Sequence, residues 1–144
     1  MLPRRSVIGT GALYLISLSL IGLWPTHVDR SLDLAHRPPT TWLASMFDLT
    51  PTAAYSVGET AANALLFMPL GIFLVVLLPR QGWLCATALA ASLSVLIELA
   101  QALARPERTG SLGDVVANTI GAGIAAGLVV AWRWRTAETV VSRR

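Results

Sequence analysis

The chain has little charge for its length. Only 13% of its 144 residues are charged, against about a quarter in a soluble domain, so a water-soluble globule is a poor explanation. It contains eleven arginines, no lysine and one cysteine, Cys85, which excludes an intramolecular disulfide. The arginines stand near the chain ends and in the connections between apolar runs, which does not suggest a nucleic-acid-binding surface.

Four long apolar runs fill most of the sequence instead. Hydrophobic residues make up 54% of the chain, and the mean hydropathy is +0.62. Each run approaches the roughly 20 residues that cross a bilayer, and a lipid-immersed segment of this kind satisfies its backbone as a helix. We therefore predict an all-α integral membrane bundle, one domain over residues 1–144, with four transmembrane helices at about 7–24, 61–78, 84–104 and 112–132.

The arginines also predict how these spans are oriented. Seven lie at the two chain ends or after the second span, and four lie in the other two connections. Cytoplasmic segments carry an excess of Lys and Arg, so we expect a multi-pass protein of the cell membrane with both termini in the cytoplasm. The first run exceeds the roughly 7–15 residues of a signal-peptide core, and no small-x-small cleavage pattern follows it, so we interpret it as a retained helix.

The long outer connection, Pro25–Gly58, contains an amphipathic segment. Within Thr40–Leu49, four apolar residues (Trp42, Leu43, Met46 and Phe47) recur at the spacing of one helix face. We predict a short interfacial helix here, acting either as an anchor or as a lid over a site. His27 and His36 in this loop match no compact zinc pattern, so no metal or cofactor is expected.

Polar residues interrupt three of the apolar runs at matching depths. Glu59 and Asn63 begin the second run, Glu98 and Gln101 end the third, and Asp114 and Asn118 begin the fourth. Each pair is spaced three or four residues apart and therefore shares one helix face. Ionisable groups in a membrane are expensive and usually serve a function. We therefore expect these side chains, with Arg108 from the loop between the third and fourth runs, to meet in an outward-facing polar pocket.

Two further features concern helix packing. Pro69 inside the second run predicts a kink there. Gly123 and Gly127 form a small-xxx-small pair in the fourth run, which permits close approach of another helix. That helix would come either from the same bundle or from a second copy of the chain.

Three blocks together resemble the VanZ-like family of small bacterial membrane proteins. They are N-x-x-x-F-x-P-L-G from Asn63 to Gly71, E-x-x-Q from Glu98 to Gln101, and R-x5-D-x3-N from Arg108 to Asn118. The resemblance is strongest over residues 59–126. The matching positions are Asn63, Pro69, Gly71, Glu98, Gln101, Arg108, Asp114, Asn118 and Gly121. Family members often carry another acidic residue after the arginine, where this chain has Ser111 or Gly113.

The resemblance implies a role in the cell envelope, since the family's namesake is associated with low-level resistance to the glycopeptide teicoplanin. We predict that the pocket binds an envelope lipid, or a lipid-linked or glycopeptide-like ligand, through Asn63, Glu98, Gln101, Arg108, Asp114 and Asn118. One alternative is an intramembrane enzyme with Glu98 and Asp114 as acid and base. Another is a structural subunit that docks through the glycine-rich fourth helix.

Overall fold

The computed structural model describes residues 4–22, 33–79, 82–104 and 111–141, and every regular element within them is helical. In chain order these elements are α1 (Arg4–Gly22), the 3₁₀ helix η1 (Leu34–His36), α3 (Pro38–Met46), α4 (Pro51–Leu77), α5 (Gly82–Ala104) and α6 (Leu112–Val141). Three of them contain segments long and apolar enough to cross a membrane, and α1 carries a shorter apolar segment, Ile8–Leu20. The predicted all-α membrane bundle of four helices is confirmed.

Two helices are longer than predicted. α4 begins at Pro51 rather than near residue 61, because the Thr50 hydroxyl accepts the Ala53 N–H (3.2 Å) and proline suits the first helical position. The long outer connection therefore ends at Thr50 and not at Gly58. α6 continues to Val141, past the predicted end at residue 132, and Arg133 donates to the Val75 carbonyl of α4 (3.3 Å).

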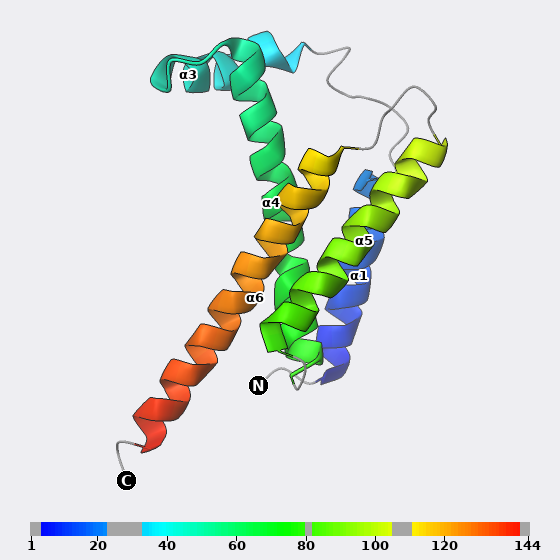
Figure 1. Cartoon of the computed structure of the whole chain (residues 1–144), viewed down its shortest axis with the longest axis vertical. Helices are drawn as coiled ribbons and strands as arrows, with labels where there is room; N and C mark the ends of the chain where they lie inside the picture. The colour runs from blue at the N-terminus through cyan, green and yellow to red at the C-terminus, as the bar shows by residue number, and fades with distance from the viewer. Residues whose placement is uncertain (1–3, 23–32, 80–81, 105–110, 142–144) are drawn as a thin grey trace.

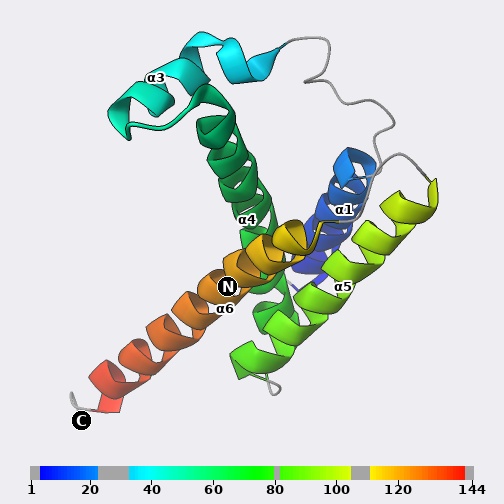
Figure 2. The ribbon, with the colours of Figure 1, turned by 45° about the horizontal axis from the view of Figure 1, so that its top comes forward.

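The helices are arranged around the contact between α4 and α6. α6 crosses α4 at an angle, while α1 and α5 lie beside this pair (Figure 1). The C-terminal part of α6 projects beyond the other helices, and the start of α4 projects toward α3 at the opposite end (Figure 2). The middle of the bundle is therefore where the four long helices meet.

Two glycines allow α4 and α6 to touch backbone to backbone. A Cβ atom at Gly71 of α4 would collide with the Ala122 carbonyl oxygen of α6, and one at Gly121 of α6 would collide with the Ala64 carbonyl oxygen of α4. At each glycine, a hydrogen instead of Cβ points at a carbonyl of the facing helix, which is the arrangement of a Cα–H···O contact. Both glycines are among the positions that match the pattern of the family.

A small core surrounds this crossing. Leu18, Phe67, Leu70, Ala90 and Ala122 form one buried cluster, contributed by all four long helices. Large apolar side chains elsewhere point outward, such as Leu103 (85% exposed) and Leu112 (83% exposed). In a membrane protein such faces meet lipid tails, so the core needs only the few residues at the helix contacts.

α1 is attached to α4 beside the proline of that helix. Pro69 has no N–H to offer the Leu65 carbonyl, and the Tyr14 hydroxyl of α1 donates to the adjacent Leu66 carbonyl. The Tyr14 ring also contacts Phe73, with 5.7 Å between ring centroids. A hydroxyl from a neighbouring helix is one way in which backbone near a membrane proline is satisfied.

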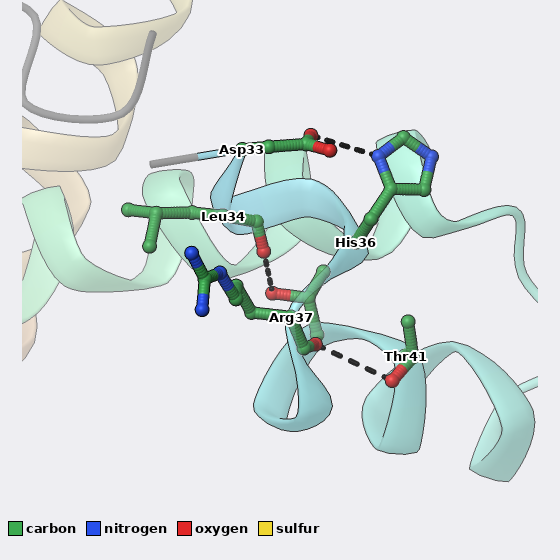
Figure 3. A network of polar contacts seen from close by, with 6 residues as sticks. Asp33, Leu34, His36, Arg37 and Thr41 are labelled. Carbon is green, nitrogen blue, oxygen red and sulfur yellow. Dashed lines mark hydrogen bonds and ion pairs between the residues drawn. The ribbon is translucent and has the colours of Figure 1, made fainter. Parts of the chain in front are cut away.

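The two short helices before α4, η1 and α3, form a separate segment with exposed apolar side chains, which we call the α3 shelf. α3 matches the predicted interfacial helix but begins at Pro38 and ends at Met46; Trp42 is 64% exposed, whereas Ala44 is buried. Polar contacts hold the preceding turn: Asp33 pairs with His36 at 2.8 Å, and the Thr41 hydroxyl donates to the Arg37 carbonyl at 3.3 Å (Figure 3). His27 lies outside the described residues.

Candidate functional site

A cavity of about 130 Å³ lies where α1, α4, α5 and α6 meet. Its polar lining consists of Glu59, Asn63, Glu98, Gln101, Asp114 and Asn118, and its apolar lining consists of Leu18, Leu66, Phe67 and Ile97. Five of the six residues predicted to bind a ligand therefore line one space. The sixth, Arg108, lies outside the described residues.

The helical spacing explains why these side chains converge. Glu59 and Asn63 share one face of α4, and Asp114 and Asn118 share one face of α6. The first halves of α4 and α6 lie level with the last turns of α5, which bring Glu98 and Gln101 to the same height. The structure therefore brings these polar side chains together at one level of the bundle.

Burial increases from one side of the cavity to the other. Glu59 is exposed, Asn63 is half-buried, and Asn118 is 7% exposed. Leu18 and Phe67 line the cavity and also belong to the buried core cluster. The cavity therefore has an open, acidic side and an enclosed side made of an amide against apolar groups.

Glu98 connects α5 to the beginning of α6. Its Oε2 accepts the Ser111 backbone N–H at 2.8 Å, and the Ser111 hydroxyl accepts the Asp114 N–H at 3.2 Å, as an N-cap does. In a capping box, the acid three residues after the cap would take the N–H of the cap residue. Here the Glu98 carboxylate accepts the Ser111 N–H instead, so the Asp114 carboxyl group, which lines the cavity, does not make that bond.

Asn118 makes the polar contact on the enclosed side. Its Nδ2 donates to the Ser94 hydroxyl oxygen at 2.9 Å, and Ser94 is fully buried (0% exposed). The Asn118 Oδ1 is buried and has no hydrogen-bond partner in the described structure. Buried polar atoms are nearly always paired, so this unpaired acceptor, on a residue that lines the cavity, is notable and calls for an explanation.

The described lining is rich in hydrogen-bond acceptors. It holds three carboxyl groups and the three amides of Asn63, Gln101 and Asn118, and none of these described lining residues is Arg, Lys or His. Within the described ranges, no three His, Cys, Asp or Glu side chains are grouped as metal ligands. This arrangement suits the hydrogen-bond donors of an organic group.

Some residues of the site were not part of the predicted ligand set. Glu59 was predicted to lie among the polar residues of the pocket but was not in the ligand-binding set. The roles of Ser94 and Ser111 depend on contacts with other helices, which the sequence does not display. Glu98, one of the predicted ligand-binding residues, also accepts the Ser111 N–H. Within the described part of the chain, none of the lining residues comes from α3, which is more consistent with an anchor than with a lid.

The fold and the cavity together define a multi-pass helical membrane protein with a polar site between its helices. A family model described as VanZ/LLP1 matches residues 12–133, and the chain belongs to that family. The match extends beyond the predicted region 59–126 and includes most of α1 and the long connection. No match was found among curated proteins or among solved structures.

Proposed function

We propose that this VanZ-family protein binds the polar end of an envelope lipid, or of a lipid-linked or glycopeptide-like ligand, in the cavity between α4, α5 and α6. The observation that carries the proposal is the unpartnered Oδ1 of Asn118 in a cavity wall. Helix packing alone gives no reason to leave a buried acceptor unpaired. A bound polar group would supply the missing partner.

The mixed lining supports an amphiphilic ligand. Carboxyl and amide groups face Leu66, Phe67 and Ile97 across the same space, so a polar head and the start of an apolar tail would both find partners. Ligand sites of this kind commonly form between the helices of a bundle. The ligand reaches the cavity from the outer leaflet if both termini are cytoplasmic, as the arginine distribution predicts.

Neighbouring leucines provide a matched crosslinking test. Leu66 lines the cavity, whereas Leu65 is 63% exposed and is not among the lining residues. We expect a photoreactive benzoylphenylalanine at position 66 to capture one class of lipid from native membranes, and the same group at position 65 to capture bulk lipid. Identical lipid profiles at the two positions, measured by mass spectrometry, would contradict the proposal.

Glycopeptide resistance is a narrower form of the same proposal. Because the cavity holds only about 130 Å³, only a terminal group of a glycopeptide such as teicoplanin could enter it. The narrower form predicts that deletion lowers the inhibitory concentration of teicoplanin and that an Asn118→Leu copy fails to restore it. If the Asn118→Leu copy restores the inhibitory concentration of teicoplanin, resistance does not depend on the cavity.

The enzyme interpretation makes a different prediction for the carboxyl groups. If Glu98 and Asp114 act as acid and base on a lipid-linked intermediate, Glu98→Gln and Asp114→Asn lose turnover and keep affinity. If the protein only binds, the same variants change affinity. Glu98 already accepts the Ser111 N–H and so has a structural role, which favours a binding function over an enzymatic one.

The proposal also includes Arg108 as a ligand-binding residue, on the evidence of the sequence alone. A planar guanidinium binds phosphate or carboxylate with two parallel hydrogen bonds, which Lys does not reproduce. We expect Arg108→Lys to weaken ligand binding nearly as much as Arg108→Ala, with unchanged abundance in the membrane. Full activity of the Ala variant would remove Arg108 from the site.

A further inference from the structure

We infer that α1 is a lateral gate of the cavity. It separates from α4 and α5 to admit the ligand from the bilayer, and Leu18 closes the cavity when α1 returns. The inference rests on the proposed function and specifies the route by which a lipid reaches that site. Three observations carry it: what α1 contributes to the cavity wall, how narrowly α1 is packed, and what attaches it to its neighbours.

The polar part of the cavity is built by α4, α5 and α6, and α1 only closes it. All six polar lining residues come from those three helices, whereas Leu18 is the one described lining residue on α1. Leu18 is 5% exposed and belongs to the core cluster that also contains Phe67 and Ala90. Moving α1 away therefore opens the apolar side of the cavity toward lipid and leaves the polar lining in place.

α1 is packed along a narrow stripe. Among its described side chains, Gly11 and Leu18 are buried and Tyr14 is half-buried, and this spacing of three and four residues marks one helix face. The large apolar residues beside the stripe are exposed, as Leu13 (66%) and Ile16 (58%) show. Lipid tails are as apolar as these side chains, so no hydrophobic force holds two membrane helices together. A helix held along one stripe is therefore easily exchanged for lipid.

The stripe attaches α1 to α4 by few contacts. The Tyr14 hydroxyl donates to the Leu66 carbonyl, the Tyr14 ring contacts Phe73, and a Cβ at Gly11 would lie 3.8 Å from the Phe73 ring. One hydrogen bond of this kind contributes little between membrane helices. By contrast, α4 and α6 touch backbone to backbone at two glycines, and two hydrogen bonds join α5 to α6. Of the four helices around the cavity, α1 is the one that separates most readily.

A reversible crosslink between α1 and α4 tests the inference. In a Cys85→Ala background, Gly11→Cys and Phe73→Cys place two thiols across the contact just described. The disulfide is formed in detergent after lipid has been removed, and the protein is then added to vesicles made from native-membrane lipid. Benzoylphenylalanine at position 66 reports the lipid in the cavity. We expect the crosslink to lower capture of the selected lipid class about tenfold or more, because it removes an open state that is typically a minor population of 0.1–10%. A reductant should restore capture by the same protein.

Matched controls separate gating from general damage. Benzoylphenylalanine at position 65, where Leu65 is 63% exposed, should capture bulk lipid equally in the oxidised and reduced protein. Tyr14→Phe, with no added cysteine, removes the bond to Leu66. It should speed capture at position 66 about threefold, the factor that one average hydrogen bond between membrane helices provides. Ser17→Ala should leave the rate unchanged, because the Ser17 hydroxyl donates to Leu13 of α1 itself.

The outcomes separate the gate from the proposed function. Capture at position 66 that reduction does not change, or that Tyr14→Phe does not speed, overturns the gate. The proposed function survives that result if the lipid profile at position 66 still differs from the profile at position 65. Identical profiles at the two positions in both redox states overturn the proposed function and the gate with it. If the two thiols do not oxidise, the capture rate of Tyr14→Phe against Ser17→Ala decides.

Discussion

At the scale of single residues, Ser94 and Asn118 place an enclosed polar contact between α5 and α6. Their hydrogen bond of 2.9 Å joins two side chains that lie away from lipid and water. Hydrogen bonds between membrane helices average about 0.6 kcal/mol, with values up to about 1.7 kcal/mol, because the separated helices find other partners. The contact is therefore modest in energy but fixes the position of the Asn118 amide.

Replacing Ser94 measures this contact. Ser94→Ala removes the acceptor of the Asn118 Nδ2, and we expect it to lower the free energy of unfolding by about 0.6–1.7 kcal/mol. Ser92→Ala is the matched control, because the Ser92 hydroxyl is exposed and donates only to Ala88 of its own helix. Unfolding in mixed micelles monitored by circular dichroism gives both values. Equal effects of the two variants would mean that the interhelical bond contributes nothing.

Glu98 offers a second test at this scale. Its carboxylate stabilises the N-terminus of α6 through the Ser111 N–H, where a negative charge is favoured by the helix dipole. Glu98→Gln keeps an acceptor and loses the charge, so we expect a loss of roughly 1 kcal/mol, and Glu98→Leu should lose more by leaving the N–H unpaired. The same unfolding measurement applies. A Gln variant more stable than the wild type would show that repulsion among the cavity carboxyl groups outweighs the bond.

The residue-level predictions succeeded where local spacing decides the outcome. Asn63, Glu98, Gln101, Asp114 and Asn118 were grouped by helix phase and depth, and the structure brings them to one cavity. Whether they bind a ligand stays a prediction. The partners of Glu98 and Asn118 could not be predicted, because Ser111 and Ser94 are ordinary residues whose roles arise only from the packing of α5 against α6.

At the scale of the elements, α4 and α6 determine the fold through their glycine contacts. Gly71→Ala or Gly121→Ala places a methyl group against a backbone carbonyl, which cannot move away as a side chain can. We expect each variant to cost about 1–3 kcal/mol, as overpacking does, and to lower the melting temperature in detergent. Gly127→Ala is the control on the same helix, because a Cβ there meets nothing within 4 Å. Equal melting temperatures for Gly121→Ala and Gly127→Ala would contradict the close crossing.

Helix existence was predictable and helix ends were less so. The apolar runs identified the four long helices because a span of lipid requires an uninterrupted helix. α4 was predicted ten residues short because the apolar run begins only after the polar residues Glu59 and Thr60. The helix itself starts earlier, at Thr50 and Pro51. A Cβ atom at Gly123 would lie 3.2 Å from the Thr87 side chain of α5, whereas one at Gly127 would meet nothing within 4 Å. Homo-oligomerisation through this pair stays a prediction.

At the scale of the whole molecule, the polar cavity and the projecting end of α6 lie at different places along the bundle. The cavity is lined by the first half of α6, whereas the arginine-containing segment after Trp132 extends beyond the other helices. Arg133 reaches back to the Val75 carbonyl near the end of α4, which ties this segment to the opposite end of the bundle from the α3 shelf. A membrane around the bundle would thus leave the α3 shelf and the end of α6 on opposite sides.

That separation makes the orientation testable with single cysteines. In a Cys85→Ala background, Asp48→Cys lies in the exposed turn after α3, and Ala137→Cys lies in the exposed last turns of α6. Arginine is enriched on the cytoplasmic side, so we expect an impermeant maleimide to label position 48 in intact cells and position 137 only after permeabilisation. Labelling of both positions in intact cells would mean that the two segments share a side, so that the chain crosses the membrane an even number of times between them and not three times. Labelling of position 137 alone would invert the bundle, and the cavity would then take its ligand from the cytoplasmic leaflet.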